Sequence, residues 1–183
     1  MSLRIYLAEI RVTIMKKAKT KKTVLRVIAA ILCIAWMVLI FVFSSKDATD
    51  SAKQSEGVTA FVVNVILDLF TDITEEEKDA ARVELEPKIR TLAHFTLFFV
   101  LASLYYYFLS AFGNRIEKNA LLAFCSAAVY AVTDEIHQYF VPGRTMQLSD
   151  LVTDSMGAAL AVALIMLVLF AIKVKNSENN TPQ

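Results

Sequence analysis

The chain has 183 residues, of which 56% are hydrophobic, and its formal net charge at pH 7 is +1. Soluble domains usually contain about 45–50% apolar residues, so the excess here favours a membrane protein. The near-neutral charge argues against a nucleic-acid partner, and the low content of 4 Gly and 3 Pro disfavours a loop-rich β architecture. Cys33 and Cys125 both lie in apolar runs, so we expect small core residues rather than a disulfide.

Four segments are apolar enough to cross a bilayer as helices. A helix needs about 20 mainly apolar residues to cross a hydrocarbon core about 30 Å thick. The predicted spans are residues 24–43, 92–112, 120–141 and 151–172. We therefore predict an all-α, polytopic membrane protein, built as a bundle of four transmembrane helices.

The residues before the first span are basic and carry apolar side chains at roughly helical spacing. This pattern predicts a short amphipathic helix over residues 2–15, lying on the inner membrane surface. A cleaved signal peptide is not expected, because the basic region is long and the first span has full transmembrane length. The predicted organisation is a basic cytoplasmic segment, a four-helix membrane domain and a cytoplasmic tail, over residues 1–23, 24–172 and 173–183.

The distribution of charge predicts the orientation of the chain. Lys and Arg near the ends of spans mark the cytoplasmic side, and here they gather on one side: Lys16, Lys17, Lys19, Lys21, Lys22, Arg26, Arg115, Lys118, Lys173 and Lys175. The segment between the first two spans is acidic and is expected to form an outer loop. Within it, residues 58–70 are apolar but too short to span, so they either lie in the interface or pack against the bundle. Both termini are therefore predicted to be cytoplasmic.

The third span is irregular, because its apolar part is short. Residues 120–133 are roughly 14 in number, or about 21 Å at 1.5 Å per residue. Crossing the membrane therefore draws the polar residues Asp134 to Gln138 into its outer boundary. Ionisable side chains at that depth are costly, so a group of them normally pairs or lines a wet cavity.

The predicted topology brings the unusual polar residues to one outer level. The candidate ligand-binding residues are His94, Asp134, Glu135, Gln138, Arg144, Asp150 and Asp154. Pro142 and Gly143 predict a tight turn that joins the third and fourth spans as a hairpin. Gly157 shares a helical stripe with Asp150 and Asp154 and would allow a neighbouring helix to approach closely.

Structural explanations for these polar residues stand beside the functional one. Polar groups at helix ends often cap or snorkel, and Arg144 is equally suited to a structural salt bridge with Asp134 or Asp150. A metal site built from His94, His137, Asp134 and Asp154 is chemically feasible, but the sequence contains no compact motif such as H-E-x-x-H. Neither a metal nor another cofactor is predicted.

Taken together, the residues around the hairpin turn resemble the signature of the VanZ-like family of bacterial membrane proteins. The specific part is an acidic pair, Gln, an aromatic residue, Pro-Gly-Arg, an Asp, then Asn or Asp, and Gly. These features correspond here to Asp134, Glu135, Gln138, Phe140, Pro142, Gly143, Arg144, Asp150, Asp154 and Gly157. Supporting features are Trp36 and the Phe43-Ser44-Ser45 end of the first span, and Arg90 four residues before His94. Asp154 stands where the family often has Asn.

The resemblance implies a multi-pass protein of the bacterial cytoplasmic membrane. The family is named for a protein that confers low-level resistance to teicoplanin. The leading hypothesis is a non-enzymatic envelope protein that binds an anionic or lipidated ligand, such as an envelope lipid or a lipoglycopeptide, at its outer face. The alternative is an enzyme acting on a lipid-linked envelope substrate, in which His94 or His137 is the general base oriented by Asp134 or Asp154. It is less favoured because no nucleophile stands out. A third hypothesis treats the polar cluster as purely structural.

Overall fold

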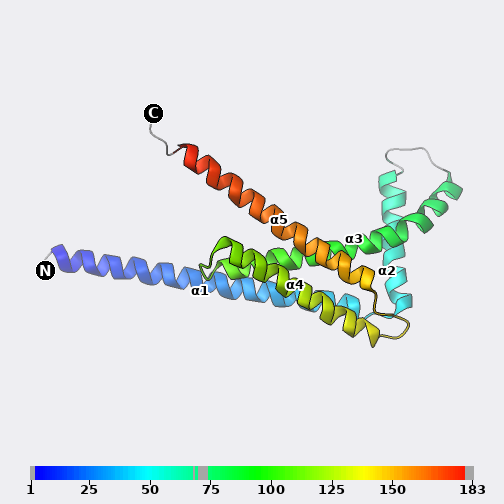
Figure 1. The fold of residues 1–183 in the computed structure, drawn as a ribbon, viewed down its shortest axis with the longest axis horizontal. Coiled ribbons are helices and arrows are strands. Elements are labelled where there is room, and N and C mark those ends of the chain that lie inside the picture. The colour runs from blue at the N-terminus through cyan, green and yellow to red at the C-terminus, as the bar shows by residue number, and fades with distance from the viewer. Residues whose placement is uncertain (1–2, 68, 70–73, 180–183) are drawn as a thin grey trace.

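The structure, a computed structural model, is a bundle of long helices (Figure 1). It describes residues 3–67, 69 and 74–179, and that part of the chain contains no strand. The helices are α1 (Leu3–Ser44), α2 (Ala48–Phe61), the π-helix η1 (Val62–Leu67), α3 (Glu75–Ser110), α4 (Ile116–Tyr139) and α5 (Leu148–Asn179). The prediction of an all-α fold is confirmed.

Among the described residues, four helices are long and apolar enough to cross a membrane. These are residues 15–44 of α1 and the whole of α3, α4 and α5. They correspond to the four predicted spans. Because the long helices alternate in direction, both ends of the chain lie at one end of the bundle, and α2 and the α4–α5 turn lie at the other (Figure 1).

The helix predicted near the N-terminus is continuous with the first span. α1 runs without a break from Leu3 to Ser44, over 42 residues. No irregular segment separates the two parts, because residues 16–23 contain no Gly or Pro. The amphipathic character expected for residues 2–15 depends on side chains that lie mostly outside the described residues.

The acidic segment between the first two spans is largely helical in its described residues. The carboxylates of Glu75, Glu76 and Glu77 occupy the first turn of α3, where they complement the positive end of the helix dipole. Thr74 and Glu77 form a reciprocal capping box, in which the Thr74 backbone N–H donates to Glu77 Oε2 at 2.8 Å. The clustered acidic residues therefore begin a helix.

α2 also begins at a side-chain cap. Asp47 Oδ1 accepts a hydrogen bond from the backbone N–H of Asp50 at 2.8 Å. This backbone hydrogen bond is the main cause that lowers the pKa of Asp47. Asp47 lies three residues after the end of α1, and the chain turns sharply between α1 and α2 (Figure 1).

The apolar stretch formed by the end of α2 and η1 packs against the bundle through one face. Thr59 and Val63 are buried, whereas Val58, Phe61 and Val65 are exposed. α2 and η1 both contact α3. Of the two placements considered for residues 58–70, packing is the one observed for the described residues; residues 68 and 70 lie outside them.

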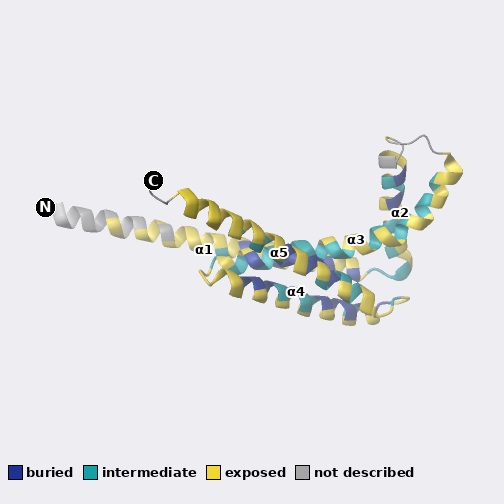
Figure 2. Ribbon diagram, turned by 45° about the horizontal axis from the view of Figure 1, so that its top comes forward, coloured by how far each residue is buried: buried dark blue, intermediate teal, exposed yellow. Residues whose placement is uncertain are grey.

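α3 is the central helix, since it contacts α1, α2, α4 and α5. Small side chains form much of its interface with α4 and α5: Ala123, Ala127, Ala131, Ala158 and Ala161 are all almost fully buried. Small residues let helices approach closely inside a membrane, where contact between helices depends on packing. Figure 2 shows this buried interior, with exposed residues along the outer faces.

The expectation of two core cysteines is half correct. Cys33 is buried, but Cys125 is exposed. In a soluble protein an apolar neighbourhood usually indicates the core, whereas the outside of a membrane helix is equally apolar. The sequence pattern around Cys125 therefore could not distinguish an inward from an outward position.

A close helix approach occurs at Gly157 of α5, as its position in the sequence predicts. A Cβ atom at Gly157 would lie 2.2 Å from the backbone oxygen of Phe95 in α3. Backbone atoms cannot move aside as a flexible side chain can. Only glycine fits at this crossing.

Gly157→Ala should destabilise the protein by about 1–3 kcal/mol or more, because it forces α3 and α5 apart. The measurement is the thermal unfolding midpoint of the purified protein in detergent. Gly57→Ala is the matched control, because nothing lies within 4 Å of a Cβ at Gly57 in α2, and alanine is favoured there. Equal midpoints for the two variants would contradict the close crossing.

Candidate functional site

A pocket of about 510 Å³ lies between α1, α2, η1, α3 and α4. Its volume is within the range of about 300–1,000 Å³ that is typical of small-molecule sites. Apolar side chains from three helices and η1 form part of its lining: Trp36, Ile40, Phe43, Val58, Val62, Ile89, Leu92, Ala93, Leu97 and Phe98. The pocket is thus suited to an apolar chain.

The other lining residues are polar, and several are ionisable. They are Ser44, Ser51, Gln54, Ser55, Arg90, His94, Thr96, Asp134, Gln138 and Arg144. Trp36 fixes one wall, because its indole N–H donates to the backbone oxygen of Leu97 at 2.9 Å. A pocket with both apolar and charged walls can hold an amphipathic molecule.

The α4–α5 turn places Arg144 at this pocket. The backbone N–H of Arg144 donates to the oxygen of Val141 at 3.1 Å, and Gly143 has a φ of +74°. Pro142 followed by a glycine at positive φ is the pattern of a type II turn. The predicted hairpin turn is therefore present, and its Arg144 Nη1 lies 3.4 Å from the backbone oxygen of Ser44 at the end of α1.

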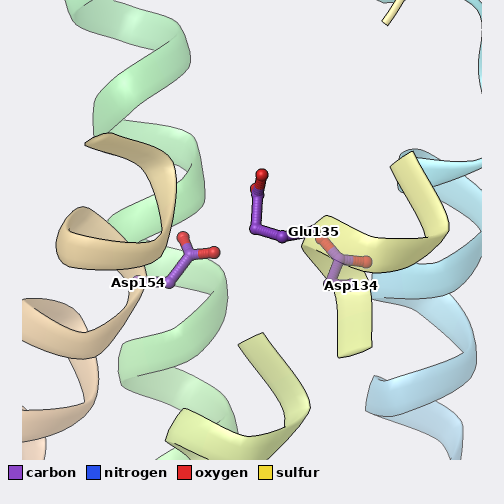
Figure 3. A group of neighbouring side chains, drawn as sticks. All are labelled: Asp134, Glu135 and Asp154. Atoms are coloured by element: carbon purple, nitrogen blue, oxygen red, sulfur yellow. The ribbon is translucent and has the colours of Figure 1, made fainter. Parts of the chain in front are cut away.

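Beside the pocket, three acidic side chains from two helices converge (Figure 3). Asp134 and Glu135 of α4 and Asp154 of α5 each offer a carboxylate oxygen, and these atoms lie within 4.8 Å of one another. The three residues are 5%, 0% and 0% exposed, respectively. Two unit charges 4.8 Å apart repel by roughly 3.5 kcal/mol at an effective dielectric constant of about 20.

Hydrogen bonds satisfy only part of this cluster. Gln138 Nε2 donates to Asp134 Oδ2 at 2.8 Å, and the backbone N–H of Gln147 donates to Glu135 Oε2 at 2.8 Å. Glu135 Oε1 and both carboxylate oxygens of Asp154 are buried without a hydrogen-bond partner. Unpaired buried acceptors are costly, so the cluster contains unused binding capacity.

His94 is the basic side chain nearest to Asp154. Its Nδ1 lies 3.4 Å from Asp154 Oδ1. His94 precedes Phe95, the residue whose backbone meets Gly157, and Asp154 lies one helical turn before Gly157. The close helix crossing therefore sets the position of this His–Asp pair.

His137 lies apart from the acidic cluster. Its Nε2 is 3.0 Å from Ser45 Oγ, and its ring stacks on Phe41 at a centroid distance of 4.4 Å. His137 thus faces the end of α1. The residue that lies beside Asp134 and Asp154 is Glu135 rather than His137. The four-residue combination of His94, His137, Asp134 and Asp154 considered from the sequence does not assemble.

The structure adds Arg90 to the predicted binding residues. Arg90 lies on α3 one turn before His94, and both line the pocket. Burial, followed by the positive charge of Arg90, lowers the pKa of Arg144. The four-residue spacing of Arg90 and His94 was the signal that could have identified it. Lys88, two residues before Arg90, does not line the pocket and forms an exposed ion pair with Glu84 at 2.6 Å.

The predicted binding residues thus fall into three groups. His94, Asp134, Gln138 and Arg144 line the pocket. Glu135 and Asp154 are buried beside it, next to Asp134. Asp150 is partly exposed near the start of α5 and accepts a hydrogen bond from Ser149 at 3.3 Å.

The fold and the polar pocket define a multi-pass membrane protein with an ionisable site at one end of its helix bundle. A family model described as VanZ/LLP1 matches residues 29–170. Because this match covers most of the sequence, the chain belongs to the VanZ/LLP1 family. No curated protein and no solved structure matches the chain.

Gln138→Leu should lower the thermal unfolding midpoint, because it removes the donor to the buried carboxylate of Asp134. Loss of a partner to a buried charged group costs about 1–3 kcal/mol or more. The control is Gln147→Ala, since Gln147 contributes its backbone N–H and its side chain is exposed. A Gln138→Leu variant as stable as the control would show that the Gln138–Asp134 bond adds no stability.

Proposed function

We propose that this chain is an envelope protein of the bacterial cytoplasmic membrane that binds an anionic, lipidated ligand in the 510 Å³ pocket. The observation that carries the proposal is the combination of apolar walls from α1, α2 and α3 with two guanidinium groups, Arg90 and Arg144. The apolar walls would contact the lipid chain, and the two arginines would bind the anionic group.

The charges of the pocket support an anionic ligand. Among the described residues, neither Arg90 nor Arg144 has a carboxylate oxygen within 4.0 Å. The salt bridge between Arg144 and Asp134 or Asp150, considered from the sequence, is therefore not formed. Two half-buried guanidinium groups that repel each other would be stabilised by a shared anion. Guanidinium groups suit phosphate and carboxylate because they can donate two parallel hydrogen bonds.

Two sources of such a ligand fit the family. One is an anionic lipid of the envelope, and the other is a lipoglycopeptide of the teicoplanin type, because the family takes its name from a protein that confers low-level teicoplanin resistance. In either case Gln138, which lines the pocket, would supply a further polar contact. We propose that capture of this ligand lowers susceptibility to teicoplanin.

The proposal places the pocket at the outer leaflet and both termini in the cytoplasm. Its support is the distribution of basic residues, which flank the spans at the end of the bundle that holds the two termini (Figure 1). The pocket lies at the opposite end, beside α2 and the α4–α5 turn. A ligand from the outer leaflet would then reach the pocket without crossing the membrane.

A second candidate function rests on the His94–Asp154 pair. His94 lines the pocket and approaches Asp154 at 3.4 Å, an arrangement that suits a general base oriented by a carboxylate. His137 does not line the pocket, so His94 would be the base for a lipid-linked substrate. Purified protein that converts a labelled envelope lipid, and loses this activity in His94→Asn, would favour this function over binding alone.

Arg144→Ala and Arg90→Ala should each weaken binding of an anionic lipid at least tenfold, a loss of about 1.4 kcal/mol. The measurement is a titration of the purified protein in nanodiscs with a fluorescent phosphatidylglycerol, compared with its zwitterionic phosphatidylcholine analogue. Lys88→Ala is the matched control, because Lys88 lies on the same helix but pairs with Glu84 at the surface.

The same variants provide a cellular readout. At equal membrane abundance, Arg144→Ala and Arg90→Ala should increase teicoplanin susceptibility relative to Lys88→Ala. Unchanged lipid binding in both variants would overturn the proposed site. A normal lipid affinity with altered protein abundance would instead support a purely structural role for these residues.

The orientation is testable with single cysteines in a background that lacks Cys33 and Cys125. A cysteine at Lys53 should react with a membrane-impermeant maleimide in intact cells, whereas a cysteine at Lys118 should react only after lysis. Both positions are exposed, so the accessible side of the membrane decides the result. The reverse labelling pattern would place the pocket at the inner leaflet.

A further inference from the structure

The convergence of Asp134, Glu135 and Asp154 has a consequence that is separate from ligand binding in the pocket. The three carboxyl groups come from α4 and α5, and one oxygen of each lies within 4.8 Å of the others. Figure 3 shows Asp154 reaching from α5 toward the two carboxyl groups of α4. Residues on two helices therefore present oxygen atoms to one small volume.

The cluster contains buried carboxylate oxygens without a hydrogen-bond partner, which favours the binding of a positive charge. Asp154 is 0% exposed, and neither of its carboxylate oxygens has a hydrogen-bond partner. Glu135 is also 0% exposed, and its Oε1 has no partner. Buried carboxylates are normally paired or bound to metal, and among the described residues only His94 brings a basic nitrogen within 4.0 Å of the cluster.

We propose that Asp134, Glu135 and Asp154 bind a divalent metal cation. Carboxylate oxygens are the preferred ligands of Mg²⁺, Ca²⁺ and Mn²⁺. The oxygens of Asp154 and Glu135 that lack hydrogen-bond partners would coordinate the cation, which would offset the repulsion among the three carboxylates. Asp134 also lines the pocket, which provides a route by which the cation reaches the buried residues.

The proposed cation site does not depend on the proposed lipid. Hydrogen bonds from Gln138 and Gln147 hold Asp134 and Glu135 in place through one oxygen each. The helix crossing at Gly157 holds Asp154 opposite them. The cluster is thus fixed by the fold, and cation binding can be measured on the protein alone.

The experiment is a titration of Mn²⁺ into the purified full-length chain in detergent, followed by electron paramagnetic resonance of the free ion. Wild-type protein should bind one Mn²⁺ per chain saturably, and Mg²⁺ or Ca²⁺ should compete. Asp154→Asn and Glu135→Gln should each weaken binding at least tenfold. Glu117→Gln is the matched control, because Glu117 lies on α4 with Asp134 and Glu135 but is exposed and outside the group of three.

Thermal unfolding of each variant separates loss of binding from loss of fold. Mn²⁺ should raise the unfolding midpoint of the wild type and of Glu117→Gln, but not of Glu135→Gln. Glu135→Gln retains a side-chain oxygen for the Gln147 N–H, so it decides the result if Asp154→Asn fails to fold. Absence of saturable binding by the wild type, or wild-type affinity in Glu135→Gln, would overturn the proposal. Lipid affinity is measured separately, so failure of either proposal leaves the other intact.

Discussion

The close crossing of α3 and α5 is the constraint on which the rest of the structure depends. Gly157 lies against the backbone oxygen of Phe95 with no room for a Cβ. Because α3 also contacts α1, α2 and α4, its position determines where the other helices can pack. The same crossing holds His94 next to Asp154. One glycine thereby couples the packing of the bundle to the geometry of its polar site.

The polar end of the bundle separates opposite charges into two adjacent places. Arg90 and Arg144 line the pocket, whereas Glu135 and Asp154 are buried beside it, and Asp134 belongs to both. Complete pairing of these groups would form a closed network with little capacity to bind another molecule. Their separation leaves the two guanidinium groups at the pocket and, beside the pocket, carboxylate oxygens that lack hydrogen-bond partners. This arrangement is expensive inside a membrane protein, which favours a functional explanation.

Much of the fold follows from local sequence signals. Long apolar runs predict the four spans, Pro142-Gly143 predicts the turn, and the stripe containing Gly157 predicts a close helix contact. Each of these features depends on a few neighbouring residues. The short apolar part of the third span also predicts a polar site at its outer end, to which Asp134, Glu135 and Gln138 contribute.

Features that depend on packing between distant segments were harder to predict. The separation of His137 from the acidic cluster follows from how α4 rotates against α1, since its partners Phe41 and Ser45 are remote in sequence. The pocket wall formed by α2 depends on tertiary packing in the same way. Cys125 shows a further limit, because both sides of a membrane helix are apolar. Arg90 could have been predicted from the sequence, because its four-residue spacing from His94 places both residues on one helix face.

The distribution of the acidic residues along the chain has a consequence for biogenesis. Synthesis proceeds from the N-terminus, so the residues of α4, including Asp134 and Glu135, are made before those of α5. At that stage α4 lacks both Asp154 and the Gln147 N–H that later binds Glu135. The tight turn at Gly143 allows α4 and α5 to insert together as a helical hairpin. Such paired insertion would shorten the time that unpartnered carboxyl groups spend facing lipid during assembly.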